Sequence, residues 1–445
     1  MSGWSHASTR WFGTWCVGTL CLAGFCGAPV LAGELVYGAG YSLVYESNVT
    51  RVRDNPIAEW TQSLFGLLAY QERSVDLSAR LQAQVEKRDY LRNTYSDERI
   101  YNVNAAAVWT ISPQQFTWTV EDVARQVQLN ITAPDTPSNR TNANSLSTGP
   151  DFTFRLDPTN NVDIAARYTR YTIDGPGDTR SYSARTGWVH RVSELTTLSL
   201  NYVATRLINL DPGPFGDTLL EQRFLRFETR PFLGVLTIDA GTARVAQEGA
   251  GDRNARLTRL TFLRQLTPES SFRASFAREY LNTSRELLGG VTSATQSPAG
   301  APSTPSTIVA TRDVYYSRSS DISYQNRSFR YCGFALRRFE RSVESLQPDL
   351  QDYEERSVRI DCDWLYSDAA RIHAYTDYAR RTFPDPFRQD QVRNSGVIAT
   401  YGLNQNVNIL VGAERFAQSS SMFLNDFVDW RVTLKLAYSS SPLRR

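Results

Sequence analysis

The chain has no long apolar run after residue 33, because polar or charged residues interrupt every stretch before about 18 residues are reached. A membrane-spanning helix in this part of the chain is therefore excluded. Histidine and methionine are rare, with three and two residues, and the only lysines are Lys87 and Lys435. No cluster of histidine and cysteine and no glycine-rich phosphate loop with a lysine is present, so we expect no metal and no cofactor.

The chain also has little net charge. Its 48 basic and 46 acidic residues leave a formal charge of +2, which provides no global field to attract nucleic acid, and we expect no nucleic-acid partner. Nearly all of the basic residues are arginine. Two interpretations stay open: biased genomic base composition, which we favour, or selection for fork-shaped contacts with anions.

The first residues have the layout of an export signal. Arg10 precedes an apolar run from Trp11 to Leu31, and small residues lead to Ala32, so we predict cleavage near Ala32. A lipoprotein anchor at Cys26 is disfavoured, because bulky Phe25 stands where a small residue is needed. The prediction divides the chain into a signal peptide (1–32), one large domain (33–438) and a short C-terminal tail (439–445).

A strict alternation of apolar and polar residues organises the rest of the chain. It is clearest from Val75 to Glu86, where every odd position is apolar and every even position is polar. Successive side chains of a β-strand point to opposite faces, so this pattern predicts a strand with one apolar and one polar face. Similar ribbons recur to the last one, Trp430 to Tyr438, and short turns alternate with longer connections.

These features predict an all-β fold, a transmembrane antiparallel up-and-down β-barrel of about 20 strands, within a range of 18 to 22. A barrel in lipid must close, because an open edge would leave backbone groups unpaired. The apolar faces then meet lipid and the polar faces line a wet lumen. The residues that we predict to line the lumen are Arg80, Glu86, Asp163, Arg167, Arg185, Arg359, Asp361 and Asp363.

Cys332 and Cys362 are the only cysteines after residue 32. In an antiparallel hairpin the numbers of opposed residues sum to a constant, and a centre at Gln347 pairs the two cysteines. We therefore predict that they lie opposite each other on adjacent strands. Opposed Cβ atoms lie about 4.5 to 5.5 Å apart, so a disulfide stays open. The same register has two further pairs on the polar face, Arg359 with Ala335 and Asp361 with Gly333.

The segment from Leu287 to Thr311 is rich in serine, threonine, proline and glycine. We favour a mobile outer loop, because such a composition buries no core. The alternative is a segment that folds into the lumen as a constriction.

Two stretches carry a resemblance to a known family: Tyr41 to Val49 (YSLVYESNV) and Trp118 to Asp122 (WTVED). The chain resembles the β-barrel outer-membrane proteins associated with exopolysaccharide and PEP-CTERM (exosortase) gene clusters. Those proteins typically end their first strand in an Asp-Asn or similar turn, whereas this chain has Ser47-Asn48. The resemblance implies a Gram-negative outer-membrane barrel that is porin-like or linked to surface polysaccharide, and it implies no catalytic residue.

We therefore expect no enzyme, and we expect a porin-like channel or the outer-membrane component of exopolysaccharide or surface-protein export. Its partners would be outer-membrane lipid and lipopolysaccharide, with polysaccharide or envelope export components as further candidates. One alternative is a structural or adhesion barrel with a closed lumen and partner-binding outer loops. A less favoured one is an outer-membrane hydrolase, for which His190 and His373 are the available bases.

Overall fold

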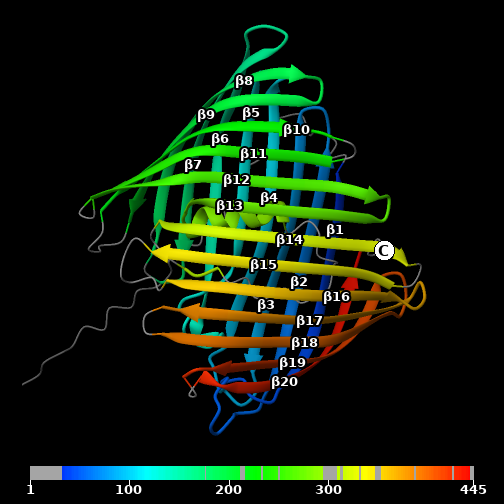
Figure 1. Cartoon of the computed structure of the whole chain (residues 1–445). Helices are drawn as coiled ribbons and strands as arrows, with labels where there is room; N and C mark the ends of the chain where they lie inside the picture. Colours follow the sequence, from blue (N-terminus) through cyan, green and yellow to red (C-terminus); the bar gives the residue numbers. More distant parts are fainter. Residues whose placement is uncertain are drawn as a thin grey trace, which may run out of the picture.

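A computed structural model describes residues 33–440 with internal gaps (Figure 1). The predicted signal peptide and its cleavage near Ala32 lie outside the described residues. The backbone is not described for residues 1–32, 176, 211–215, 232–233, 249–250, 294–307, 311–313, 330–331, 346–351, 385–386, 423–424 and 441–445. Side chains are also not described at positions 290–293, 328–329, 332 and 345.

Twenty antiparallel strands form one sheet, which confirms the predicted number. In chain order the strands are β1 Glu34–Glu46, β2 Glu59–Arg73, β3 Leu77–Tyr90, β4 Glu98–Ser112, β5 Phe116–Gln128, β6 Arg140–Arg155, β7 Asn160–Ile173, β8 Thr179–Ser193, β9 Thr196–Asn209, β10 Thr218–Thr229, β11 Gly234–Gln247, β12 Gly251–Thr267, β13 Ser270–Leu281, β14 Tyr315–Phe329, β15 Cys332–Ser345, β16 Tyr353–Leu365, β17 Ala370–Phe383, β18 Arg388–Gly402, β19 Val407–Ser420 and β20 Phe427–Ser439. One 3-10 turn (Pro137–Asn139) and one helix, α1 (Thr283–Ser293), complete the described elements.

The sheet closes on itself because β1 pairs with β20 as well as with β2. At this seam Tyr41 lies opposite Leu436. Gly40 of β1 is required there, because a Cβ atom at this position would collide with the Leu436 carbonyl oxygen and with the Phe65 ring. The closed antiparallel barrel is therefore confirmed, and it leaves no unpaired sheet edge.

The alternation of residue types becomes an alternation of faces. In β3 the predicted ribbon begins at Leu77, two residues later than the pattern suggested, and Val75 precedes the strand. Val85 is 50% exposed on the outside of the barrel, and none of the described residues forms a second layer over it. None of the helices described is long and apolar enough to cross a membrane.

The connections alternate in length, as predicted. One end of the barrel has short turns such as 74–76 and 366–369, and the other has longer connections such as 47–58 and 282–314. One connection at this second end is short, because only residues 248–250 separate β11 from β12. We call the two ends the short-turn end and the long-loop end.

The hairpin of β15 and β16 forms as predicted, but its register differs by two residues. Cys332 lies opposite Trp364 and Cys362 lies opposite Phe334, so the direct opposition of the two cysteines is wrong. The hairpin is centred on residue 348 instead of 347. A shift of the centre by one residue changes the pairing partner of every residue by two positions. The polar-face pairs change likewise: Arg359 lies opposite Arg337, and Asp361 lies opposite Ala335.

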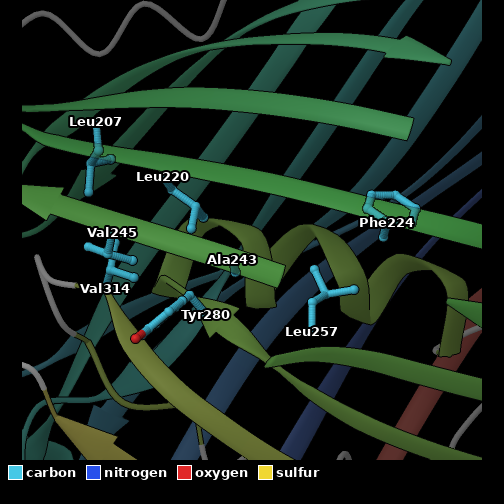
Figure 2. Packing of buried hydrophobic residues seen from close by; sticks show 8 residues of the cluster. All are labelled: Leu207, Leu220, Phe224, Ala243, Val245, Leu257, Tyr280 and Val314. Carbon is cyan, nitrogen blue, oxygen red and sulfur yellow. The ribbon is translucent and has the colours of Figure 1, made fainter. Parts of the chain in front are cut away.

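Buried apolar side chains gather in three small clusters. The largest joins β9 to β13 and Val314, near the long-loop end, and is shown in Figure 2. Its members are Leu207, Leu220, Phe224, Ala243, Val245, Leu257, Tyr280 and Val314. The other two clusters include residues from connections that turn into the barrel, and these connections define the candidate site.

Candidate functional site in the barrel lumen

The inner face of the wall is identified by its contacts with α1, which lies inside the barrel between the front and rear strands (Figure 1). Ser284 of α1 contacts Ser145 of β6, with 2.6 Å between their Oγ atoms, and Arg125 of β5 faces the Leu287 carbonyl. Opposed residues of paired strands share a face, so the strand registers extend this assignment around the barrel. We call this side the inner face and the other side the outer face.

Helix α1 begins with a side-chain cap. Asn282 Oδ1 accepts a hydrogen bond of 2.9 Å from the Arg285 N–H, which satisfies a donor at the start of the helix. Leu287 is fully buried against the inner face, in the cluster formed with Val123, Val127, Ala143, Tyr171 and Ile308. The helix is therefore docked by the same apolar contacts that close a protein core.

An ion pair holds the other side of α1. Glu286 Oε1 lies 2.7 Å from a guanidinium nitrogen of Arg341 on β15, and Glu286 also accepts a hydrogen bond from the Tyr315 hydroxyl. The Arg341 side chain is only 9% exposed. The helix thus bridges β5 and β6 on one wall to β14 and β15 on another.

The described residues that follow α1, 308–310, pair with the end of β5. The Gln128 N–H donates a hydrogen bond to the Ile308 carbonyl (3.1 Å), and the Gln128 carbonyl accepts one from the Ala310 N–H (2.8 Å). The Thr283 hydroxyl donates to the Val309 carbonyl at 3.0 Å. The described parts of the predicted outer loop, residues 287–293 and 308–310, therefore fold inward, which corrects that prediction; residues 294–307 and 311 lie outside the description. The segment contains few apolar residues, but three of them, Leu287, Ile308 and Val309, are buried in apolar clusters inside the barrel.

A second connection, residues 129–139 between β5 and β6, also crosses the lumen. The Thr132 carbonyl accepts a hydrogen bond of 2.6 Å from Arg388 on β18. Ile131 is buried beside Val309, Tyr353 and Phe383. This connection therefore contacts both the opposite wall and the segment that follows α1.

Asp135 is the ionic anchor of this connection. It forms a two-point ion pair with Arg140 and lies 3.6 Å from Arg51, which enters from the connection between β1 and β2. Burial disfavours the carboxylate, but the hydrogen bonds and charge of Arg140 and the charge of Arg51 outweigh burial and lower the pKa of Asp135 to about 2. The Arg51 guanidinium also lies over the Phe416 ring at 5.6 Å. Three connections from the long-loop end thus meet inside the mouth of the barrel.

The eight residues predicted to line the lumen fall at inner-face positions of β3, β7, β8 and β16. Several of them pair with neighbours. Glu86 binds Arg88 (2.9 Å), Arg167 binds Asp151 (2.6 Å), and Asp163 accepts a hydrogen bond from Thr153 (2.9 Å). Arg80 lies opposite Gln71 and Ala106, and Arg185 lies opposite Ala165 and Val203.

The three predicted residues of β16 come together with β17. Arg359 binds Asp361 at 2.7 Å and lies over the Tyr375 ring at 4.7 Å. Asp363 binds Arg371 at 2.8 Å and His373 at 3.0 Å. His190, the second histidine in the described part of the chain, is on the outer face, where it stacks on Trp188 and contacts Asn160. His190 and His373 therefore lie on opposite faces of the wall.

Sequence reasoning missed several inner-face charges. Their shared feature is that each contacts a partner on another strand or on an inward connection, as in the chain from Arg226 through Asp239 and Arg259 to Glu279. The same holds for the pair of Arg381 with Glu355 and the pair of Arg431 with Glu46. Alternation places such residues on the polar face, but only the register identifies their partners.

No family model matches the chain, and no curated protein matches it in sequence. Among solved structures, a mutant ferric enterobactin receptor, PfeA, from Pseudomonas aeruginosa in complex with enterobactin aligns with a TM-score of 0.44 and 12% identity, covering 91% of this chain and 81% of that chain. The FrpB iron transporter from Neisseria meningitidis gives 0.44 and 10%, covering 91% and 81%. OpdK from Pseudomonas aeruginosa with vanillate gives 0.40 and 11%, covering 91% and 99%.

Proposed function

We propose that the protein is a channel of the Gram-negative outer membrane, in which the barrel wall contacts lipid and the charged inner face lines a constricted path for small solutes. The observation that carries this proposal is the inverted distribution of side chains. Large apolar residues are exposed on the outer face, whereas charged residues such as Asp239 and Glu59 are each 1% exposed on the inner face. A water-soluble barrel would reverse this order.

The outer face has an apolar zone that runs around the barrel. Leu64 is 65% exposed, Val397 52% and Leu434 52%, and they come from three different strands. Exposure of so many large apolar side chains on one closed surface is costly in water and favourable in lipid.

Aromatic residues border this zone at both ends, which further supports a membrane location. At the long-loop end the exposed aromatic residues include Trp60, Tyr182, Phe387 and Trp430. At the short-turn end they include Tyr37, Trp109, Trp118, Phe154, Trp188, Trp364, Tyr366, Tyr401 and Tyr438. From Trp430 to Tyr438 the strand extends about 27 Å. A tilt of about 40° projects this to roughly 20 Å, near the ~25 Å apolar band of such barrels.

The lumen supports passage of small solutes better than passage of a polymer. Helix α1 and residues 129–139 occupy the mouth, and charges of both signs lie on the inner face, so a general or weakly selective path is expected. Export of exopolysaccharide or of surface proteins, the role implied by the family resemblance, would require α1 to leave the lumen.

The inward connections also favour a second candidate, a structural or adhesion barrel with a closed lumen. Conductance of the purified protein in a planar lipid bilayer separates the two. The channel proposal expects discrete conductance steps at moderate voltage. Stable insertion into the bilayer without conductance at any voltage would contradict the channel and favour the closed barrel, whereas failure to insert would contradict both.

A further inference from the structure

A second candidate site lies on the outer face of β12 to β14, near the long-loop end. It is a cavity of about 660 Å³, and its lining includes Arg256, Arg278, Arg318, Tyr280, Tyr316 and Glu344. The three arginines are exposed. They lie on the side of the wall opposite to α1, so they do not line the lumen and have no role in the proposed channel.

The charges of this cavity are unbalanced. Arg278 lies directly opposite Arg318 across β13 and β14, and like charges at opposed strand positions repel each other. Glu344 binds Arg318 at 2.6 Å, with both side chains nearly half exposed. Among the residues that the structure describes, no carboxylate pairs with Arg256 or Arg278. An anion that contacts both opposed guanidinium groups would remove the repulsion.

The position of the cavity indicates that such an anion would belong to a lipid headgroup. Towards the short-turn end, the outer face of the same strands carries apolar residues such as Leu260, Phe276 and Ile322. Tyr280 and Tyr316 stack edge to face beside the arginines, with ring centroids 5.3 Å apart. Aromatic and basic side chains above an apolar band match the level of lipid headgroups.

We propose that this cavity binds the phosphate groups of lipid A in the leaflet at the long-loop end, with Arg278 and Arg318 as the principal donors. Guanidinium groups form two-point hydrogen bonds with phosphate, and opposed positions bring two of these groups within reach of one headgroup. The inference rests on the proposed outer-membrane location.

Nearby arginines of the outer face provide a matched control. Arg206 of β9 lies 2.8 Å from Asp217, and Arg244 of β11 is paired with Asp252. These two residues have the same charge, the same face and the same end of the barrel. Each has its own carboxylate partner, whereas only Arg318 of the tested pair has one.

The test is native mass spectrometry of the detergent-solubilised protein titrated with diphosphoryl lipid A. We expect the variant Arg278→Gln/Arg318→Gln to bind lipid A about tenfold more weakly or worse, because it removes both guanidinium groups that would bind the phosphate. The variant Arg206→Gln/Arg244→Gln should bind as the unchanged protein does. Heat-dependent gel migration establishes that each barrel is folded, and the two single variants replace the double variant if it does not fold.

Equal binding by the double variant and its control would overturn the proposal. Equal binding of fully dephosphorylated lipid A would also overturn it, because the phosphate would then be irrelevant. Displacement of lipid A by an equal concentration of inorganic phosphate would indicate a free-anion site instead of a lipid site. The titration is carried out in detergent, so its result does not depend on conductance, and a barrel that binds lipid A without conducting would contradict the channel alone.

Discussion

Two connections fold into the lumen, and they are held there by different forces. Helix α1 is docked by the buried side chain of Leu287 and by the pair of Glu286 with Arg341. Residues 129–139 are held by Asp135, which is bound to Arg140 at the start of β6 and to Arg51 of the connection between β1 and β2. Leu287 gives α1 an uncharged anchor beside its ion pair, whereas residues 129–139 combine the buried side chain of Ile131 with ion pairs that both depend on the Asp135 carboxylate.

This difference gives the two connections different sensitivities. Apolar packing responds little to pH, whereas an anchor that depends on one carboxylate is lost when the carboxylate is protonated. We therefore expect residues 129–139 to be released under conditions in which α1 stays docked. Changes to each anchor test this difference, beginning with the complete removal of α1.

Removal of α1 should have the largest effect. Leu281 and Tyr315 lie directly opposite each other, so a short glycine-serine linker can join β13 to β14 without residues 282–314. If α1 constricts the path, single-channel conductance in a planar bilayer should rise several-fold. An unchanged conductance from a folded variant would mean that α1 does not lie on the conducting path.

The ion pair of α1 should contribute next. Glu286→Gln leaves Arg341 buried without its carboxylate, and loss of one partner of a buried pair costs about 3–5 kcal/mol. Hydrogen exchange of the α1 amides should accelerate accordingly. The control is Glu340→Gln, which removes an exposed pair with Arg338 on the outer face and should cost less than about 1 kcal/mol. Unchanged protection of α1 in Glu286→Gln would show that the pair does not hold the helix.

Loss of apolar packing should have a somewhat smaller effect. Leu287→Ala removes a fully buried side chain and should weaken docking of α1 by about 2–4 kcal/mol, measured by the same exchange experiment. The control is Leu288→Ala, the adjacent and only partly buried position. If the two variants exchange equally fast, Leu287 is not the apolar anchor.

The barrel itself follows from local properties of the sequence. The alternation from Leu77 to Glu86 fixes which side chains share a face, and the alternating connection lengths indicate the strand number. Pairing partners do not follow as readily. A one-residue error in the centre of the hairpin between β15 and β16 moved the partner of Cys362 from Cys332 to Phe334, while the face of every residue stayed the same.

The inward connections could not be predicted because their contacts are distant in sequence. Ser284 contacts Ser145, and Arg388 contacts Thr132, across separations of 139 and 256 residues. The alternation of apolar and polar residues along a strand contains no information about contacts between residues so far apart. A serine- and proline-rich stretch also separates Leu287 from Ile308 and Val309, and it has the composition of a solvated loop.

The smallest effect, and the one that tests the comparison most directly, is that of pH on residues 129–139. The pKa of Asp135 is lowered to about 2 in the folded protein, below the value of about 3.9 expected in an unfolded chain. The charged form therefore stabilises this connection above pH ~4, and the stabilisation is lost as the pH falls through about 2. It amounts to about 2.6 kcal/mol.

Hydrogen exchange of residues 129–139 should therefore be protected near neutral pH, after correction for the intrinsic rate, and should lose protection between about pH 4 and pH 2. Asp135→Asn should abolish this pH dependence and reduce protection at neutral pH, because the amide carries no charge to pair with Arg140 and Arg51. The amides of α1 serve as the internal reference. If α1 and residues 129–139 lose protection together over this pH range, the two connections share one anchor and the distinction between them is wrong.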